Sequence, residues 1–253
     1  MQTVELKYLI YLSPERAIKY LKDKGYKFSW NWYEIWQDSH KKSFTVAKAM
    51  REDILVDIRK AVEQSMQEGL TLQQFKKELE PKLKSKGWWG KVSVSDGETI
   101  ETVQLGSVWR LKTIYRTNIQ TSYMAGRYKA QVENTDNRPY WQYVAVMDRK
   151  TRESHAQLNG RVFRYDDPFW NDFYPPNAWG CRCRVRALSG DNIKDRDLIV
   201  DSTKGQLSQE MKLVSKKTDE LKPVAVYTDP LTGHKISPDV GWSYNPGKEF
   251  KVK

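Results

Sequence analysis

Cysteine is scarce in this sequence: the 253 residues include two, Cys181 and Cys183, with a single arginine between them. A small secreted protein held together by several disulfides needs more cysteines than this, so that class is excluded. A disulfide between two cysteines so close in the chain would be strained. We therefore interpret the pair as reduced thiols or as metal ligands in a cytosolic setting.

Long apolar runs are missing as well. No stretch approaches the roughly 20 apolar residues that a transmembrane helix needs. The first ten residues contain Glu5 and Lys7, where a secretory signal peptide would be continuously apolar. We therefore expect no membrane contact and a protein that is made and used inside a cell. Internal repeats and low-complexity tracts are absent too.

Positive charge is in excess, with 43 lysines and arginines against 32 aspartates and glutamates, which gives a formal net charge of +11. Each phosphate that a lysine or arginine neutralises releases condensed counterions, so such a chain can bind DNA without sequence preference. A basic surface that is merely solvated explains the same excess. Charge alone leaves both interpretations open.

Helical patterns dominate the N-terminal part of the chain. Ser13 and Pro14 are typical of a helix start, and Gly25 of a helix end. From residue 44 to residue 67, apolar residues recur every four positions. This spacing predicts a long amphipathic helix that ends near Gly69.

Further elements follow in the same region. Thr71 is placed to cap another helix, which the Gly87–Gly90 segment would end. Residues 92–103 are polar and contain Asp96 and Gly97, which indicates a loop or a short β-hairpin. The pattern from residue 107 to about residue 134 predicts a third helix.

Three short strands are predicted next. Residues 140–147 are rich in aromatic and β-branched residues, and residues 161–164 and 181–186 are candidate partners. Residues 166–180, between the last two strands, form a loop heavy in proline and aromatic residues. A small sheet beside helices is expected.

The C-terminal region is polar and contains several prolines and glycines. One helix around residues 208–216 and a coil-like end with little core of its own are predicted there. The predicted fold class is thus α+β. Its parts are a helical N-terminal region (1–106), a core domain with a long helix and a small antiparallel sheet (107–188), and an extended polar C-terminal region (189–253).

An ordered set of residues runs through the predicted core domain. Its members are Arg116-Thr117, Asp148-Arg149-Lys150-Thr151-Arg152, His155, Gly160, Pro175-Pro176 and Cys181-Arg182-Cys183. This ordered set resembles the pattern of the phage head morphogenesis domain of the Mu F-like family. The terminal residues 241–247 resemble a short motif of the same proteins.

The resemblance implies a structural minor head protein of a tailed phage, with no catalytic residue, that assists prohead assembly at the portal. The partners it implies are the portal protein, the major capsid or scaffolding protein, and double-stranded DNA bound without sequence preference. It implies a location in the virion, in the head interior or at the portal vertex, and in the host cytoplasm during assembly. The alternative function is a metal-dependent DNA-processing enzyme, a nuclease carried in the virion.

A zinc site is the sharpest chemical hypothesis. Side chains two apart in a strand share a face, so Cys181 and Cys183 would present two sulfurs to one point. His155 adds a third ligand suited to zinc, and Asp148 is a candidate fourth. In the alternative interpretation no metal is bound, and the cysteines are small buried apolar residues. His155 then forms a hydrogen bond to a turn carbonyl, and Asp148 caps its turn.

Enzymatic zinc chemistry fits poorly. A zinc deaminase needs His-x-Glu and Cys-x-x-Cys, whereas Gln157 lies two residues after His155 and one residue separates the cysteines. A metal-dependent nuclease needs a base and an open coordination position. The remaining histidines, His40 and His234, lie in unrelated segments. We therefore expect no enzymatic activity.

Arginines crowd the same stretch. If they share one face, they form a surface for phosphates or for acidic residues of a partner, with tryptophans interleaved. In the alternative interpretation they pair with Asp166, Asp167 and Asp172, while the aromatic residues fill a core. The candidate binding residues are Arg149, Arg152, Arg164, Arg182 and Arg184.

Overall fold

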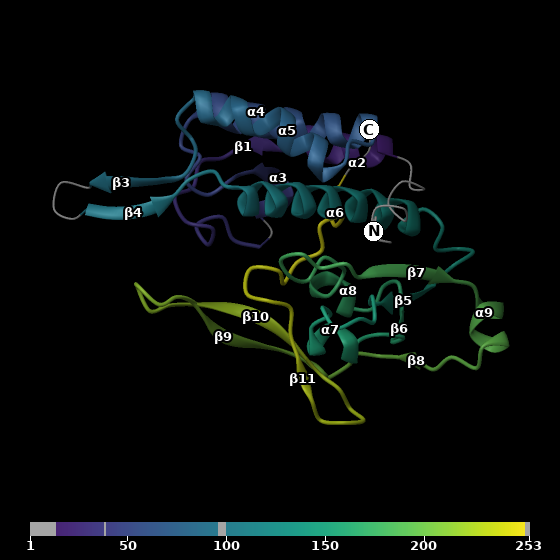
Figure 1. Cartoon of the computed structure of the whole chain (residues 1–253). Coiled ribbons are helices and arrows are strands. Elements are labelled where there is room, and N and C mark those ends of the chain that lie inside the picture. Colours follow the sequence, from purple (N-terminus) through teal and green to yellow (C-terminus); the bar gives the residue numbers. More distant parts are fainter. Residues whose placement is uncertain (1–13, 38, 96–99, 251–253) are drawn as a thin grey trace. The chain divides into compact units, whose positions relative to one another are not determined.

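The computed structural model describes residues 14–37, 39–95 and 100–250 (Figure 1). The chain divides after Ile119 into two compact units, and each is described by itself. The predicted cap Ser13 and the first ten residues lie outside the described residues. The fold is α+β, as predicted from the sequence.

Helices make up most of the N-terminal unit. Its described elements include α2 (Pro14–Lys22), α4 (Glu52–Glu68), α5 (Leu72–Ser85) and the first part of α6 (Val108–Val132). On α4, side chains three or four positions apart are buried, and the helix ends at Gly69, which is left-handed with φ 66°. No helix among the described residues is long and apolar enough to cross a membrane.

Helix α4 is shorter than predicted, because it begins at Glu52 and not near residue 44. The residues before it form α3 (Ser39–Lys42) and β2 (Ser43–Phe44), and β2 pairs in parallel with β1 (Gly25–Tyr26). Lys48 has a φ of 64°, which no right-handed helix accommodates. The four-residue spacing therefore extends beyond the helix itself.

Helix α5 begins at the predicted cap. Thr71 accepts a hydrogen bond from the Gln74 amide, and the Gln74 side chain accepts one from the Thr71 amide, which completes a capping box. The polar segment after the helix is the hairpin of β3 (Lys91–Ser95) and β4 (Ile100–Gln104).

The C-terminal unit contains a four-stranded sheet in the order β7-β5-β6-β8. Strand β5 pairs antiparallel with both β6 and β7, whereas β8 runs parallel to β6. The third strand was predicted to start at Cys181, but it starts at Arg184. The strands are β5 (Tyr140–Val144), β6 (Val162–Arg164), β7 (Arg184–Leu188) and β8 (Val200–Asp201).

Short helices and the second half of α6 accompany this sheet. On α6, the side chains of Arg127 and Gln131 both donate to the Val185 carbonyl of β7, at 2.9 and 3.1 Å. These bonds attach the long helix to the sheet. The short helices are α7 (Glu153–Gln157), α8 (Phe169–Asp172) and α9 (Gly190–Asp195).

The C-terminal region differs most from prediction. The helix predicted at residues 208–216 is wrong: this segment is β9 (Leu207–Ser215), paired along its length with β10 (Glu220–Thr228). The long antiparallel partner satisfies the backbone hydrogen bonds and overrides the local helical preference. Figure 1 shows the two strands as a long hairpin, and β11 (Lys235–Ile236) lies beside β10.

The C-terminal region was also predicted to have little core of its own, and this prediction is wrong. Val224, Tyr227, Ile236, Trp242 and Tyr244 are all buried. Tyr227 and Ile236 belong to the hydrophobic cluster around the central sheet. Aromatic rings dominate this cluster, as the alternative interpretation of the aromatic residues expected. Its large members include Trp141, Phe163, Phe169, Trp170, Phe173 and Tyr174.

Gly247 offers a test of this packing. A Cβ atom there would lie 2.5 Å from the Cβ atom of Tyr128 on α6. We expect Gly247→Ala to lower the free energy of unfolding in urea by about 1–3 kcal/mol, because overpacking must be relieved by a shift. Gly190→Ala is the matched control, since its added Cβ would meet no atom within 4 Å. Equal stability of the two variants would contradict the packed position of the C-terminal segment.

Candidate metal centre

His155 lies on α7 and points into the protein interior, with 3% of the residue exposed. The helix starts after Arg152, at the end of the turn that follows β5. The Nδ1 atom of His155 faces the sulfur atoms of Cys181 and Cys183. The Nε2 atom is buried and has no hydrogen-bond partner among the described residues. The alternative to a metal site was a hydrogen bond from the His155 side chain to a turn carbonyl. The side chain makes no such bond among the described residues.

Cys181 and Cys183 are buried in the segment that leads into β7, with 6% and 2% exposed. The residue before them, Gly180, is left-handed with φ 68°, and the Cys181 amide donates to the Ala178 carbonyl. Although this segment precedes the strand, both sulfurs point to one place. The His155 Nδ1 atom lies 3.7 Å from the Cys181 Sγ and 3.4 Å from the Cys183 Sγ.

These distances fit a tetrahedral zinc ion. With zinc–sulfur bonds of about 2.3 Å and zinc–nitrogen bonds of about 2.0–2.1 Å, the nitrogen and sulfur ligands of one ion lie about 3.5–3.6 Å apart. The three ligand atoms all lie within 4.8 Å of one another. Thiolate and imidazole are also the donors that zinc prefers. The residues present therefore fit three of the four positions around this ion.

Without a metal, the buried His155 side chain has no strong partner within the described part of the chain. Its Nε2 atom has no hydrogen-bond partner among the described residues. Its other nitrogen faces only sulfur, which is a weak hydrogen-bonding group. A metal bond at Nδ1 would give the buried ring a strong interaction.

The two thiols differ in acidity. Burial alone would raise the pKa of Cys181, but hydrogen bonds from Cys183 and His155 outweigh it and hold that pKa well below its ordinary value. The hydrogen bond to Cys181 raises the pKa of Cys183, and burial adds to this effect. One sulfur thus carries negative charge readily beside its protonated neighbour, which suits the capture of a cation.

Tyr143 and Asn177 support the cysteines, and neither was singled out from the sequence. The Tyr143 hydroxyl donates to Asn177 Oδ1 at 3.0 Å, and both residues are buried. Burial, with the nearby Cys183, raises the pKa of Tyr143 well above its ordinary value, so the hydroxyl keeps its proton. Alternation along β5 indicates an inward Tyr143, whereas no sequence pattern marks Asn177.

Asp148 does not belong to the group formed by His155 and the two cysteines. One of its carboxylate oxygens accepts from Arg182 at 2.7 Å, and the other accepts from the Lys150 amide at 2.9 Å. The hydrogen bond from Arg182 holds the pKa of Asp148 well below its usual range. The structure therefore places this carboxylate in the turn, in an Asx-type arrangement.

Most of the candidate binding arginines have partners inside the chain. Arg164 pairs with Asp166 at 2.9 Å, and Arg152 pairs with Asp239 at 3.2 Å. Arg182 holds Asp148, and Arg184 is half-buried. Arg149 is exposed and has no ion pair among the described residues. The five residues thus do not form one free basic face.

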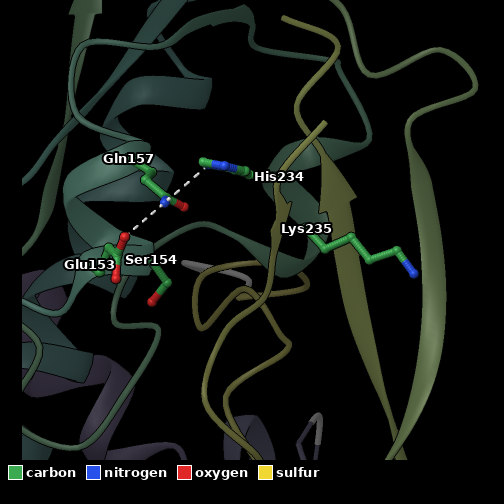
Figure 2. A pocket seen from close by; sticks show the side chains of 5 residues that line it. All are labelled: Glu153, Ser154, Gln157, His234 and Lys235. Atoms are coloured by element: carbon green, nitrogen blue, oxygen red, sulfur yellow. Dashed lines mark hydrogen bonds between the residues drawn. The ribbon is translucent and has the colours of Figure 1, made fainter. Parts of the chain in front are cut away.

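A shallow pocket lies on the outer side of α7. Figure 2 shows Glu153, Ser154 and Gln157 on the helix, with His234 across from them and Lys235 beside it. Gln157 Nε2 lies 3.5 Å from His234 Nδ1. The pocket supplies one histidine and one carboxylate, and His234 takes no part in the buried group.

Comparisons with known proteins agree on one family. A family model described as phage Mu protein F like protein matches residues 56–186. The chain is similar to the putative capsid assembly protein F of Escherichia phage Mu, with 47% identity over 251 residues, which are 97% of this chain and 57% of that protein. It is also similar to the Mu-like prophage FluMu F protein of Haemophilus influenzae, with 45% identity over 87% of this chain and 53% of that protein. No solved structure matches the chain.

The Tyr143 hydrogen bond can be tested against a tyrosine that lacks one. Tyr143→Phe leaves the buried Asn177 oxygen without its donor, and we expect a loss of about 1–3 kcal/mol in the free energy of unfolding. Tyr227 is the matched control, because it is equally buried and its hydroxyl has no partner among the described residues. Tyr227→Phe should leave stability unchanged or raise it. Equal losses in both variants would show that the Tyr143 bond contributes nothing specific.

Proposed function

The chain belongs to the phage Mu protein F-like family, and we propose on that premise that it is a structural minor head protein that assists head assembly in a tailed phage. One observation carries this proposal: 47% identity across nearly the whole chain to a protein named as a putative capsid assembly protein. The chain spans about half the length of the curated relatives it matches. Its role is therefore proposed for this portion.

The proposed partners are other components of the head. The portal protein comes first, followed by the major capsid or scaffolding protein, because the resemblance of the core motif implies assembly at the portal vertex. The proposed location is the virion, with the host cytoplasm as the place of assembly. These partners require docking surfaces rather than a reaction centre.

A zinc ion held by His155, Cys181 and Cys183 is the proposed cofactor, with a structural role. When bound, the ion supplies a link between α7 and the segment before β7. His155 is 26 residues from Cys181 and 28 residues from Cys183 along the chain. Its binding free energy then adds to the free energy of folding. The buried Tyr143–Asn177 pair keeps the cysteine segment in place.

A structural role fits the surroundings better than catalysis. A catalytic zinc site keeps one position open to water or substrate, whereas the three ligands here are between 2% and 6% exposed. A nuclease would also need a base beside the metal. Within the described part of the chain, the buried metal-binding group has no fourth histidine, cysteine, aspartate or glutamate. We propose no catalytic residue.

Zinc should be measurable in the purified protein. We expect about one zinc per chain, and we expect His155→Ala and Cys183→Ser to lose it. Their melting temperatures should fall by roughly 5–10 °C, which corresponds to about 2–3 kcal/mol for a chain of this size. Asp148→Asn is the control, because the carboxylate lies outside the group, and it should keep the metal. A protein without zinc, or an Asp148→Asn variant that loses it, would contradict the proposed site.

The assembly role has its own test. In heads isolated from a phage that encodes this chain, we expect a few copies of the protein and a crosslink to the portal ring. The reason is that a portal-associated assembly protein stays at one vertex. Crosslinks to the major capsid protein alone would remove the portal from the proposal. Heads that contain no copy of the protein would contradict the structural role.

A further inference from the structure

Helix α6 contains no acidic residue in its 25 positions. Its first three turns carry a solvent-exposed stripe, which we call the α6 basic face and define as Trp109, Lys112 and Arg116. These residues follow one another at spacings of three and four, so they lie on one side of the helix. All three are exposed, and Trp109 has 70% of its surface in solvent.

The two cations of this face have no ion pair or hydrogen-bond partner among the described residues. In this respect they differ from the arginines near the cysteines, most of which pair with carboxylates of the same unit. They differ also from Arg110 of the same helix, which is turned inward and donates to the carbonyls of Gln104 and Leu105. Lys112 and Arg116 are thus available to an external anion.

The exposed tryptophan strengthens this interpretation. Tryptophan and arginine are enriched in binding surfaces relative to the rest of a protein surface. Proteins that bind single-stranded nucleic acids without sequence preference combine aromatic rings with cations. On a duplex, the two cations can reach the phosphates in the same way. Four residues of helix span about 6 Å, which is roughly two nucleotides along one DNA strand at about 3.4 Å each.

We propose that the α6 basic face binds double-stranded DNA through its phosphates, with Lys112 and Arg116 on the backbone and Trp109 against the adjoining sugars. The proposal rests on the role of the protein in the head, where DNA is packaged, and it names the surface that would make the contact. Charge selects DNA over an apolar partner, because the stripe has two free cations and the whole helix lacks a carboxylate.

The test is duplex binding by the full chain, measured by fluorescence anisotropy over a series of salt concentrations. Each phosphate contact contributes about 0.9 to the slope of log affinity against log salt. The double variant Lys112→Gln, Arg116→Gln should therefore reduce this slope by about two and weaken binding at least tenfold at low salt. Trp109→Ala should weaken binding with little change in slope. Lys194→Gln, Lys204→Gln is the control, because both lysines are exposed and it removes the same charge.

Three results would overturn the proposal. The first is a wild-type protein that does not bind the duplex at low salt. The second is a slope that the α6 double variant leaves unchanged, or that the control reduces equally. The third is a double variant that binds DNA normally but no longer enters heads, which would assign the face to an acidic protein partner. Entry of the wild-type protein into heads is scored separately, so loss of the DNA contact is distinguishable from loss of the assembly role.

Discussion

The approach of one histidine nitrogen to two cysteine sulfurs is the constraint on which the C-terminal unit depends. It joins α7 to the start of β7 and closes the long segment between them into a loop. That loop carries much of the aromatic core, including the stacked pair Phe163 and Phe169, whose ring centroids are 4.1 Å apart. Closure of this loop costs conformational entropy, and the proposed metal link at its ends would offset part of that cost.

The C-terminal segment fastens the same loop from outside. The Asp239 amide donates to the Asn177 carbonyl, and the Trp242 ring packs edge-on against Trp179 at 5.0 Å. Asn245 donates to the Trp170 carbonyl at 2.8 Å. Residues far apart in the sequence therefore converge on the segment that contains the cysteines.

Much of the helical architecture could be predicted, because buried residues on α4 and α6 repeat at helical spacing, Gly69 marks the end of α4 and Thr71 marks the start of α5. The proximity of His155 to Cys181 and Cys183 could also be predicted, because all three are residue types that bind zinc and the cysteines are two positions apart. The cysteines were expected to lie in a strand, but β7 begins after them, at Arg184. Asp148 was expected to be a fourth ligand, but it pairs with Arg182. Strand β9 was not predicted, because its conformation depends on pairing with β10 and not on its local sequence. The role of Asn177 was not predicted, because only the fold brings this residue to Tyr143.

The net charge of the chain did not indicate where an external anion could bind, whereas the ion pairs of individual arginines did. Most arginines near the cysteines pair with carboxylates of the same unit. Lys112 and Arg116 have no such partner among the described residues, although only Arg116 belongs to the pattern that the sequence shares with the family. The metal link remains the central claim, and zinc X-ray absorption on the purified protein tests it most directly. The account predicts two sulfur neighbours at about 2.3 Å and at least one nitrogen neighbour at about 2.0–2.1 Å. A shell of oxygen and nitrogen atoms without sulfur would contradict it.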